Sequence, residues 1–217
     1  GPIVLLAASG AEALPEVVAP GHRTLGFMLP TTPLHLLVLQ RMERPVVMTS
    51  GNVSDAPAVI DDEPARRRLA TIADYLLVHE RVIANRIDDS VARVKDGRAR
   101  VLRRARGYAP APVRLPPGFD AAPPLLAHGG ELKSTFCLLA GGDAILSQHQ
   151  GDLEDRDTLD DYGKNLALYA ALFEHAPRAL VADRHPDYAS SKLARRRALA
   201  EGLPLVEVQH HHAHAAA

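Results

Sequence analysis

The chain has 217 residues, of which 47% are hydrophobic and 24% charged, and its formal net charge is −1. This balance is ordinary for one large or two small globular domains, and it excludes a strong overall field that would attract nucleic acid or an anionic membrane. One cysteine, Cys137, excludes an internal disulfide and fits a reducing, cytosolic setting. Because apolar residues flank it, we expect a buried structural thiol. We expect neither a membrane span nor a signal peptide.

The first half of the chain is expected to alternate short strands and helices. Gly/Pro-bounded apolar runs predict strands at residues 1–8, 24–30, 44–49 and 75–78. Helices are predicted at 31–41, with a threonine cap and Pro33 in the first turn, and at 61–73. Alternating residues on both sides of Asp96-Gly97 predict a hairpin of 90–95 with 98–103. Residues 107–124 are rich in proline and predict a linker between domains 1–106 and 125–217.

The second half follows the order βββαβαβα. Strands are predicted at 125–127, 135–140, 144–147, 179–182 and 205–208, and helices at 158–175, capped by Asp157, and at 188–201. A three-stranded meander followed by βα units describes a ribonuclease H-like half-domain of the actin type, in a group where two such halves clamp ATP. The predicted fold class is therefore α/β, although a fold alone does not give a function.

Two features of the first domain are candidate ligand sites. The predicted strand 44–49 runs into the turn Ser50-Gly51-Asn52-Val53-Ser54, whose hydroxyls, amide and backbone N–H groups suit an anionic or carbonyl-bearing ligand. A plain turn made of turn-forming residues is equally compatible. The hairpin is also basic: Lys95 and Arg98 fit a solvated strand face, whereas Arg104 and Arg106 are better placed to hold phosphate.

In the second domain, the loop 129–135 joins the first two strands, and its glycines allow backbone N–H groups to approach phosphate while Lys133 adds charge. It does not have the Walker spacing. His149 and Asp152 are expected near this loop. The triplet Asp183, His185 and Asp187 follows the next strand, where ligands of α/β proteins bind; each of the three could instead be a turn or cap residue, and for Asp187 helix capping is favoured.

The run from His210 to His214 follows the last predicted strand. If a helix begins there, His210 and His214 lie one turn apart on one face, the i, i+4 spacing that presents two imidazoles to one metal ion. Other interpretations are ordinary hydrogen bonding at a strand end, a purification tag and chelation without catalysis.

Several motifs, taken in their order, resemble the HypF carbamoyltransferases of nickel–iron hydrogenase maturation. In the first domain they look like the C-terminal part of a YrdC-like domain, and in the second like the N-terminal half of a Kae-type transferase domain. The motifs are residues 48–54, 88–91, 102–110, 130–137, 147–153, 183–188 and 208–214.

The resemblance implies a function. The YrdC-like domain would make carbamoyl-adenylate from ATP, with Mg²⁺ implied, and carbamoyl phosphate. The second domain would pass the carbamoyl group to the C-terminal cysteine of a HypE-like acceptor, and an RNA partner follows only by analogy with YrdC. The implied nucleotide-binding residues are Ser50, Asn52, Ser54, Ser90, Arg104, Arg106, Gly130 and Thr135.

For the transfer chemistry, the resemblance implies a divalent metal, zinc or iron, at His210 and His214, with Lys133, His211 and His212 as catalytic or substrate-contacting residues. Fixed donors and guanidinium groups would stabilise the charge that moves during adenylation. The family's first domains and the second half of its transferase domain have no counterpart in these residues, so we expect an incomplete, inactive fragment. The alternatives are a threonylcarbamoyl transferase of tRNA modification and a metal-binding module without catalysis.

Overall fold

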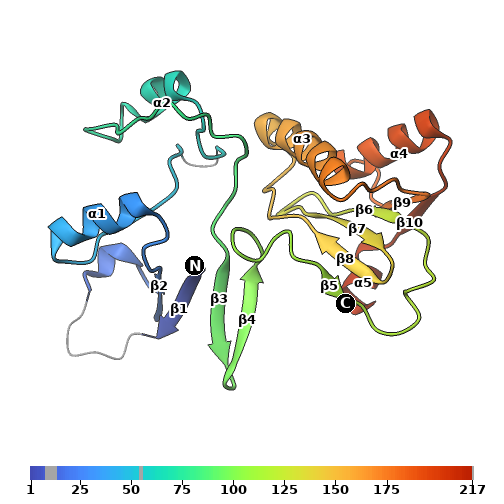
Figure 1. Ribbon diagram of the computed structural model, residues 1–217, viewed down its shortest axis with the longest axis horizontal. Coiled ribbons are helices and arrows are strands. Elements are labelled where there is room, and N and C mark those ends of the chain that lie inside the picture. Colours follow the sequence, from blue (N-terminus) through green and yellow to red (C-terminus); the bar gives the residue numbers. More distant parts are fainter. Residues whose placement is uncertain (8–13, 54–55, 217) are drawn as a thin grey trace. The chain divides into compact units, whose positions relative to one another are not determined.

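The computed structural model describes residues 1–7, 14–53 and 56–216, which form two compact units (Figure 1). The first unit comprises Gly1–Ser50 with Asp88–Tyr108, and the second comprises Gly51–Ile87 with Ala109–Ala217. Residues 51–87, which the sequence groups with the first domain, therefore belong to the second unit.

The first unit is built on a four-stranded sheet with the strand order β2-β1-β3-β4. Strand β1 pairs antiparallel with β2 and parallel with β3, and β3 and β4 form the predicted hairpin. Its elements are β1 Ile3–Ala7, the 3-10 helix Glu16–Val18, β2 Thr24–Phe27, α1 Pro33–Met42, β3 Val91–Lys95 and β4 Arg98–Arg103.

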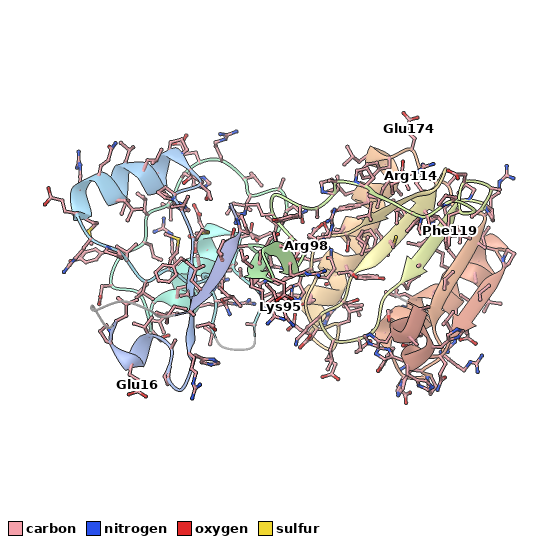
Figure 2. The ribbon with its side chains drawn as sticks, turned by 90° about the horizontal axis from the view of Figure 1, so that it is seen from below. Glu16, Lys95, Arg98, Arg114, Phe119 and Glu174 are labelled. Atoms are coloured by element: carbon pink, nitrogen blue, oxygen red, sulfur yellow. The ribbon has the colours of Figure 1, made fainter. Side chains whose placement is uncertain are left out.

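The expectations for these elements are largely confirmed. Helix α1 begins at Pro33, and the Thr32 hydroxyl accepts a hydrogen bond from the His35 backbone N–H at 3.1 Å, as a helix cap should. The strand predicted at 44–49 is wrong, because this stretch is irregular in the structure and belongs to neither sheet. Lys95 and Arg98 flank the hairpin turn with exposed side chains, as predicted for a solvated face (Figure 2).

The apolar side chains of the first unit are mostly exposed. Of its described residues only Ala92, Ala105 and Ser90 are buried, and helix α1 buries no residue at all. Leu36 is 52% exposed and Leu37 60%. Several exposed apolar side chains on one short helix are typical of a face that contacts another element or a partner.

The second unit contains a six-stranded sheet with the strand order β10-β9-β6-β7-β8-β5. Strands β6, β9 and β10 are parallel, whereas β7, β8 and β5 continue the sheet in antiparallel steps. Its strands are β5 Val113–Arg114, β6 Leu125–His128, β7 Phe136–Ala140, β8 Asp143–Leu146, β9 Ala179–Asp183 and β10 Leu205–Val208. From β6 onward the predicted order βββαβαβα is confirmed. The proline-rich stretch is more than a linker, because β5 extends the sheet.

Two helices lie on one side of this sheet, α3 (Arg156–Leu172) and α4 (Ala189–Glu201) (Figure 1). The cap of α3 is Asp155 rather than the predicted Asp157, since the Asp155 carboxylate accepts the Thr158 N–H at 2.8 Å. The expected cap of α4, Asp187, is also wrong. The first N–H of that helix, from Ala189, donates instead to Glu131 Oε2 at 2.7 Å.

The core of the second unit lies between the sheet and these helices. Leu126, Leu138 and Leu180 occupy neighbouring positions on three adjacent strands, and Phe136 and Tyr162 pack above them with ring centroids 5.6 Å apart. All five side chains are at most 1% exposed. Full burial of such side chains contributes roughly 1.5–3 kcal/mol each, so the sheet and α3 form a rigid platform.

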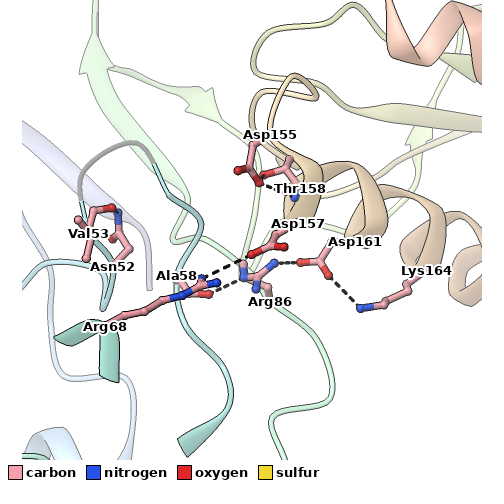
Figure 3. A network of polar contacts seen from close by, with 10 residues as sticks. All are labelled: Asn52, Val53, Ala58, Arg68, Arg86, Asp155, Asp157, Thr158, Asp161 and Lys164. Atoms are coloured by element: carbon pink, nitrogen blue, oxygen red, sulfur yellow. Dashed lines mark hydrogen bonds and ion pairs between the residues drawn. The ribbon is translucent and has the colours of Figure 1, made fainter. Parts of the chain in front are cut away.

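Helix α2 (Asp62–Leu69) lies in segment 51–87, which is held against α3 by charged contacts (Figure 3). Arg86 pairs with Asp161 and donates through Nε to the Ala58 carbonyl at 2.5 Å, and Arg68 pairs with Asp157 at 3.5 Å. These residues border a pocket of about 190 Å³. The strand predicted at 75–78 is wrong, because that stretch is irregular and unpaired.

Cys137 is half-buried in β7, and burial raises the pKa of its thiol to about 11, against an opposing hydrogen bond from the Ile145 backbone. The thiol is therefore protonated at neutral pH, as expected for a structural cysteine. Within the described residues no helix is long and apolar enough to cross a membrane.

Candidate functional site

The candidate site lies where the parallel strands of the second unit end. Asp183 is the last residue of β9, and the sheet register pairs it with Val208, the last residue of β10. Helix α5 (His210–Ala216) begins two residues later. The carboxyl ends of adjacent parallel strands are the usual place for ligands in α/β folds, so the topology brings Asp183 and His210 to that edge.

His210 and His214 face each other on α5, as their spacing predicts. Their Nε2 atoms are 3.2 Å apart, and their rings meet edge to face with centroids separated by 4.8 Å. The other ring nitrogen of His210, Nδ1, lies 2.5 Å from Asp183 Oδ2. An ionised carboxylate only accepts hydrogen bonds, so Nδ1 carries a proton, and in the neutral form of His210 the lone pair is on Nε2, which faces His214.

The Asp183 carboxylate is held in its charged form. Its burial works to raise the pKa, but the His185 N–H donates to Oδ1 at 2.9 Å and His210 donates to Oδ2, and together with the charges of both imidazoles these contacts lower the pKa of Asp183 below its ordinary value. His185 also stacks on Tyr188 at 4.1 Å. The carboxylate that orients His210 therefore stays ionised throughout the neutral range.

The pair has the geometry of two metal ligands. Two nitrogens 3.2 Å apart can each lie about 2.1 Å from one ion at an N–metal–N angle of about 100°, close to tetrahedral. A carboxylate on the far nitrogen of a ligating histidine is the usual outer contact in such sites. In residues 1–7, 14–53 and 56–216 no third histidine, cysteine or carboxylate completes a set of three. The described residues thus provide part of a coordination sphere.

Gly130, in the loop 129–135, packs closely against His210. A Cβ atom added to Gly130 would lie 3.2 Å from His210 Cε1, and one added to Gly129 would lie 2.1 Å from the Thr135 carbonyl oxygen. Only glycine at position 129 lets the two ends of the loop come so close. The structure therefore places Gly130 next to His210 and Thr135 next to Gly129; both Gly130 and Thr135 were predicted to contact a nucleotide.

Some backbone donors of this loop are already used within the protein. The N–H of Lys133 donates to Asp152 Oδ1 at 2.7 Å, and that of Ser134 donates to the Gly151 carbonyl at 2.8 Å. Lys133 has a positive φ of 50° and an exposed side chain. Its ammonium group is accessible to a ligand, but two of the loop's N–H groups are not, and the nucleotide role of the loop stays a prediction.

His211 and His212 are exposed residues of α5. At 100° per residue they are turned about 100° and 200° around the helix axis from His210, so they do not share the face of the His210–His214 pair. Their predicted catalytic roles stay predictions.

In the first unit, Ser90 takes an internal role in place of the predicted phosphate contact. Its side chain is fully buried, and its hydroxyl donates to the Arg106 carbonyl at 3.0 Å and accepts from the Ala105 N–H at 2.8 Å. A hydroxyl with both functions satisfied inside the protein ties β3 to the end of β4. The predicted phosphate contact of Ser90 stays a prediction.

The two arginines beside it are partly committed as well. Arg104 donates to the Tyr108 carbonyl at 2.9 Å, and Arg106 Nε lies 3.3 Å from Asp89 Oδ1 with nearly half of its side chain exposed. Arg106 is therefore the better placed of the two to reach an anion.

The predicted turn at 50–54 is divided between the two units. Ser50 is exposed and belongs to the first unit, whereas Asn52 belongs to the second and donates to the Val53 carbonyl at 3.0 Å. Ser54 lies outside the described residues. The predicted ligand contacts of this turn stay predictions.

His128, at the end of β6, gives the second unit a pH-dependent stability. Burial, and then the positive charge of Arg197, lower the pKa of His128 to about 4 from an ordinary 6.5. The folded state favours neutral imidazole, so this contribution is complete above pH 6.5 and is lost as the pH falls toward 4. We expect a decline in the free energy of unfolding on the order of 3 kcal/mol over that range, measured by urea titration. A similar decline in His128→Gln would contradict the assignment to His128.

Three contributors to the site were not predicted: Asp183 as the partner of His210, Glu131 as the cap of α4, and Tyr162 beneath the loop. The first could be found from the sequence, since Asp183 and His210 follow two strands that neighbour each other in a ribonuclease H-like sheet. The other two depend on packing between distant segments and leave no local pattern.

Known protein families match both halves of the chain. The family model described as HypF Kae1-like domain matches residues 120–217, and the Sua5/YciO/YrdC model described as telomere recombination matches residues 1–105. The carbamoyltransferase HypF of Rhodobacter capsulatus is 50% identical over 216 residues, covering 100% of this chain and 29% of the relative. That of Synechocystis is 43% identical, covering 98% and 27%.

Two solved structures are also similar. A crystal structure of full-length HypF in the phosphate- and nucleotide-bound form matches with a TM-score of 0.88 and 43% identity, over 98% of this chain and 33% of that one. A crystal structure of HypF from T. kodakarensis matches with the same TM-score and 38% identity, over 98% and 28%.

Fold and site thus define a protein that joins YrdC-like sequence to a Kae1-like half-domain of the ribonuclease H type. The chain belongs to the HypF carbamoyltransferase family. It spans less than a third of the length of the curated relatives it matches.

Proposed function

We propose that this chain is part of an ATP-dependent carbamoyltransferase of nickel–iron hydrogenase maturation and carries half of its transfer site. Carbamoyl phosphate and ATP would give carbamoyl-adenylate, and the carbamoyl group would pass to the C-terminal cysteine of a HypE-like acceptor. The observation that carries the proposal is the His210–His214 pair, oriented by Asp183 at the carboxyl edge of the second sheet, in a chain similar to HypF carbamoyltransferases along its whole length.

The residues divide the work at the transfer site. Nε2 of His210 and of His214 would hold a divalent ion, zinc or iron, and Asp183 keeps His210 in the tautomer that can bind it. When bound, such an ion polarises the carbonyl that is attacked. Lys133, exposed on the neighbouring loop, would balance the phosphate charge of the adenylate.

Nucleotide binding is proposed for both units. One similar structure is of a phosphate- and nucleotide-bound HypF, and here Gly130 lies against His210 and Thr135 lies against Gly129. In the first unit Arg106 is accessible to an anion, and Ser50, Asn52, Ser54 and Arg104 stay candidates.

We further propose that these residues act within a longer protein. The described residues supply two of the metal donors, and a catalytic ion usually needs at least three protein ligands. The exposed apolar residues of α1 need a cover. Isolated, the 217 residues are expected to convert no ATP to AMP in response to carbamoyl phosphate, and robust turnover would contradict incompleteness.

The proposed function is tested in a chimera. The matching segment of the Rhodobacter capsulatus relative, 50% identical, is replaced by this chain, and transfer of ¹⁴C from carbamoyl phosphate to the HypE acceptor is measured with ATP. We expect transfer within about tenfold of the parent protein. A chimera that folds and binds ATP but transfers nothing would contradict the proposal.

A further inference from the structure

The hydroxyl group of Tyr162 is placed for a task other than core packing. The ring lies in the core of the second unit against Phe136 and is fully buried. Its hydroxyl lies 2.9 Å from His128 Nδ1, and the neighbouring Gly129 backbone opposes the rise that burial causes in the pKa of the phenol. Both partners belong to the end of β6, where the loop beside the histidine pair begins. Phenylalanine would fill the same space, so the hydroxyl is what links α3 to this loop.

The direction of these hydrogen bonds follows from chemistry. A backbone N–H can only donate, so the Gly129 N–H faces the Tyr162 oxygen as a donor, while the hydroxyl and His128 Nδ1 share one proton between them. The other ring nitrogen of His128, Nε2, is buried and has no hydrogen-bond partner among the described residues. A buried polar atom without a partner is costly. The arrangement therefore fixes the position of the loop, while the unpaired Nε2 of His128 lowers the stability of the core.

The position of this loop matters for His210. Gly129 closes the loop against the Thr135 carbonyl, and Gly130 supports one edge of the His210 imidazole, so closely that an added Cβ would lie only 3.2 Å from Cε1. Asp183 fixes the same ring through Nδ1. The ring is thus held from two sides, and a displacement of the Gly129 peptide would change the direction of its Nε2 lone pair.

We propose that Tyr162 is a positioning residue of the transfer site, whose hydroxyl fixes the Gly129–Gly130 backbone and thereby the orientation of His210. This inference rests on the proposed function, because the orientation of His210 matters only if His210 binds the metal of the transfer site. The link between the hydroxyl and the loop can nevertheless be measured independently of metal or activity.

The test compares Tyr162→Phe with Tyr169→Phe. Tyr169 lies on the same helix, is also buried, and its hydroxyl donates to Gln148 Oε1 at 2.7 Å and accepts from the Gln148 N–H at 3.2 Å. Both changes remove buried hydrogen bonds, so both are expected to lower the melting temperature. Amide hydrogen exchange of Gly129 separates them, and we expect it to be about tenfold faster in Tyr162→Phe alone.

A second readout is the affinity for Zn²⁺, from competition with a chromophoric chelator. We expect about a three- to tenfold loss in Tyr162→Phe and none in Tyr169→Phe, by comparison with the larger losses caused by changing direct outer contacts. Unchanged Gly129 exchange in Tyr162→Phe would overturn the positioning role. Faster exchange with unchanged Zn²⁺ affinity would overturn its link to His210. The proposed function fails on a different result, a chimera that folds and binds ATP but transfers no carbamoyl group.

Discussion

Replacing His210 and His214 with alanine in the chimera is expected to reduce carbamoyl transfer by about a thousandfold or more. The two Nε2 atoms lie 3.2 Å apart at the strand edge, and losing the ion that we propose they hold would remove several kcal/mol of charge stabilisation. Formation of AMP from ATP and carbamoyl phosphate should continue, because adenylation is proposed for the YrdC-like domain. Both steps are measured in one reaction from ¹⁴C transfer and AMP release.

The control removes two other exposed histidines, His22 and His79, by His22→Ala/His79→Ala. It should leave transfer unchanged. Asp183→Asn is expected to lose an amount of transfer between those of the double variant and the control. Its metal affinity should fall 10- to 100-fold, because a neutral amide no longer holds the His210 Nδ1 proton by charge. Full transfer by the His210/His214 double variant would remove the metal pair from the account.

Among glycine-to-alanine substitutions in the second unit, Gly129→Ala is expected to lower the free energy of unfolding the most. The new Cβ would lie 2.1 Å from the Thr135 carbonyl oxygen, a backbone atom that cannot rotate away, so the loop must open. We expect a loss of about 2–3 kcal/mol in the free energy of unfolding, together with weaker Zn²⁺ binding, since Gly130 supports His210. Urea denaturation and chelator competition measure the two effects.

Gly163→Ala is the matched control for this change. Gly163 lies inside α3, and an added Cβ would meet nothing within 4 Å. Alanine should stabilise the helix by up to about 1 kcal/mol. If Gly129→Ala behaves like Gly163→Ala, the close approach of the loop ends is not what positions the site.

The fold of the second unit could be predicted because its apolar strands and helix caps are local features. The order βββαβαβα is visible in the alternation of apolar runs and helical stretches, and the parallel edge follows from it. Predictions failed where an apolar run lacked a strand partner: residues 44–49 and 75–78 have strand-like composition but pair with nothing. Pairing is a property of the whole sheet, which composition alone does not give.

The site was predictable to a similar degree. His210 and His214 form a pair because helical spacing alone brings them together. The burial of Ser90 could not be predicted, because its position beside arginines suggests an anion site, while its two hydrogen bonds join it to residues 15 and 16 positions away. Tyr162 was missed for the opposite reason: in the sequence it is one aromatic residue of an amphipathic helix, and only the packing reveals where its hydroxyl lies.

The most direct test of the account is the position of the metal. Crystals of the chain grown with Zn²⁺ and measured at the zinc absorption edge should show an anomalous peak about 2.1 Å from Nε2 of both His210 and His214, with Asp183 still bonded to His210 Nδ1. A peak on His211 or His212, or a His210 bound through Nδ1, would contradict the proposed transfer site.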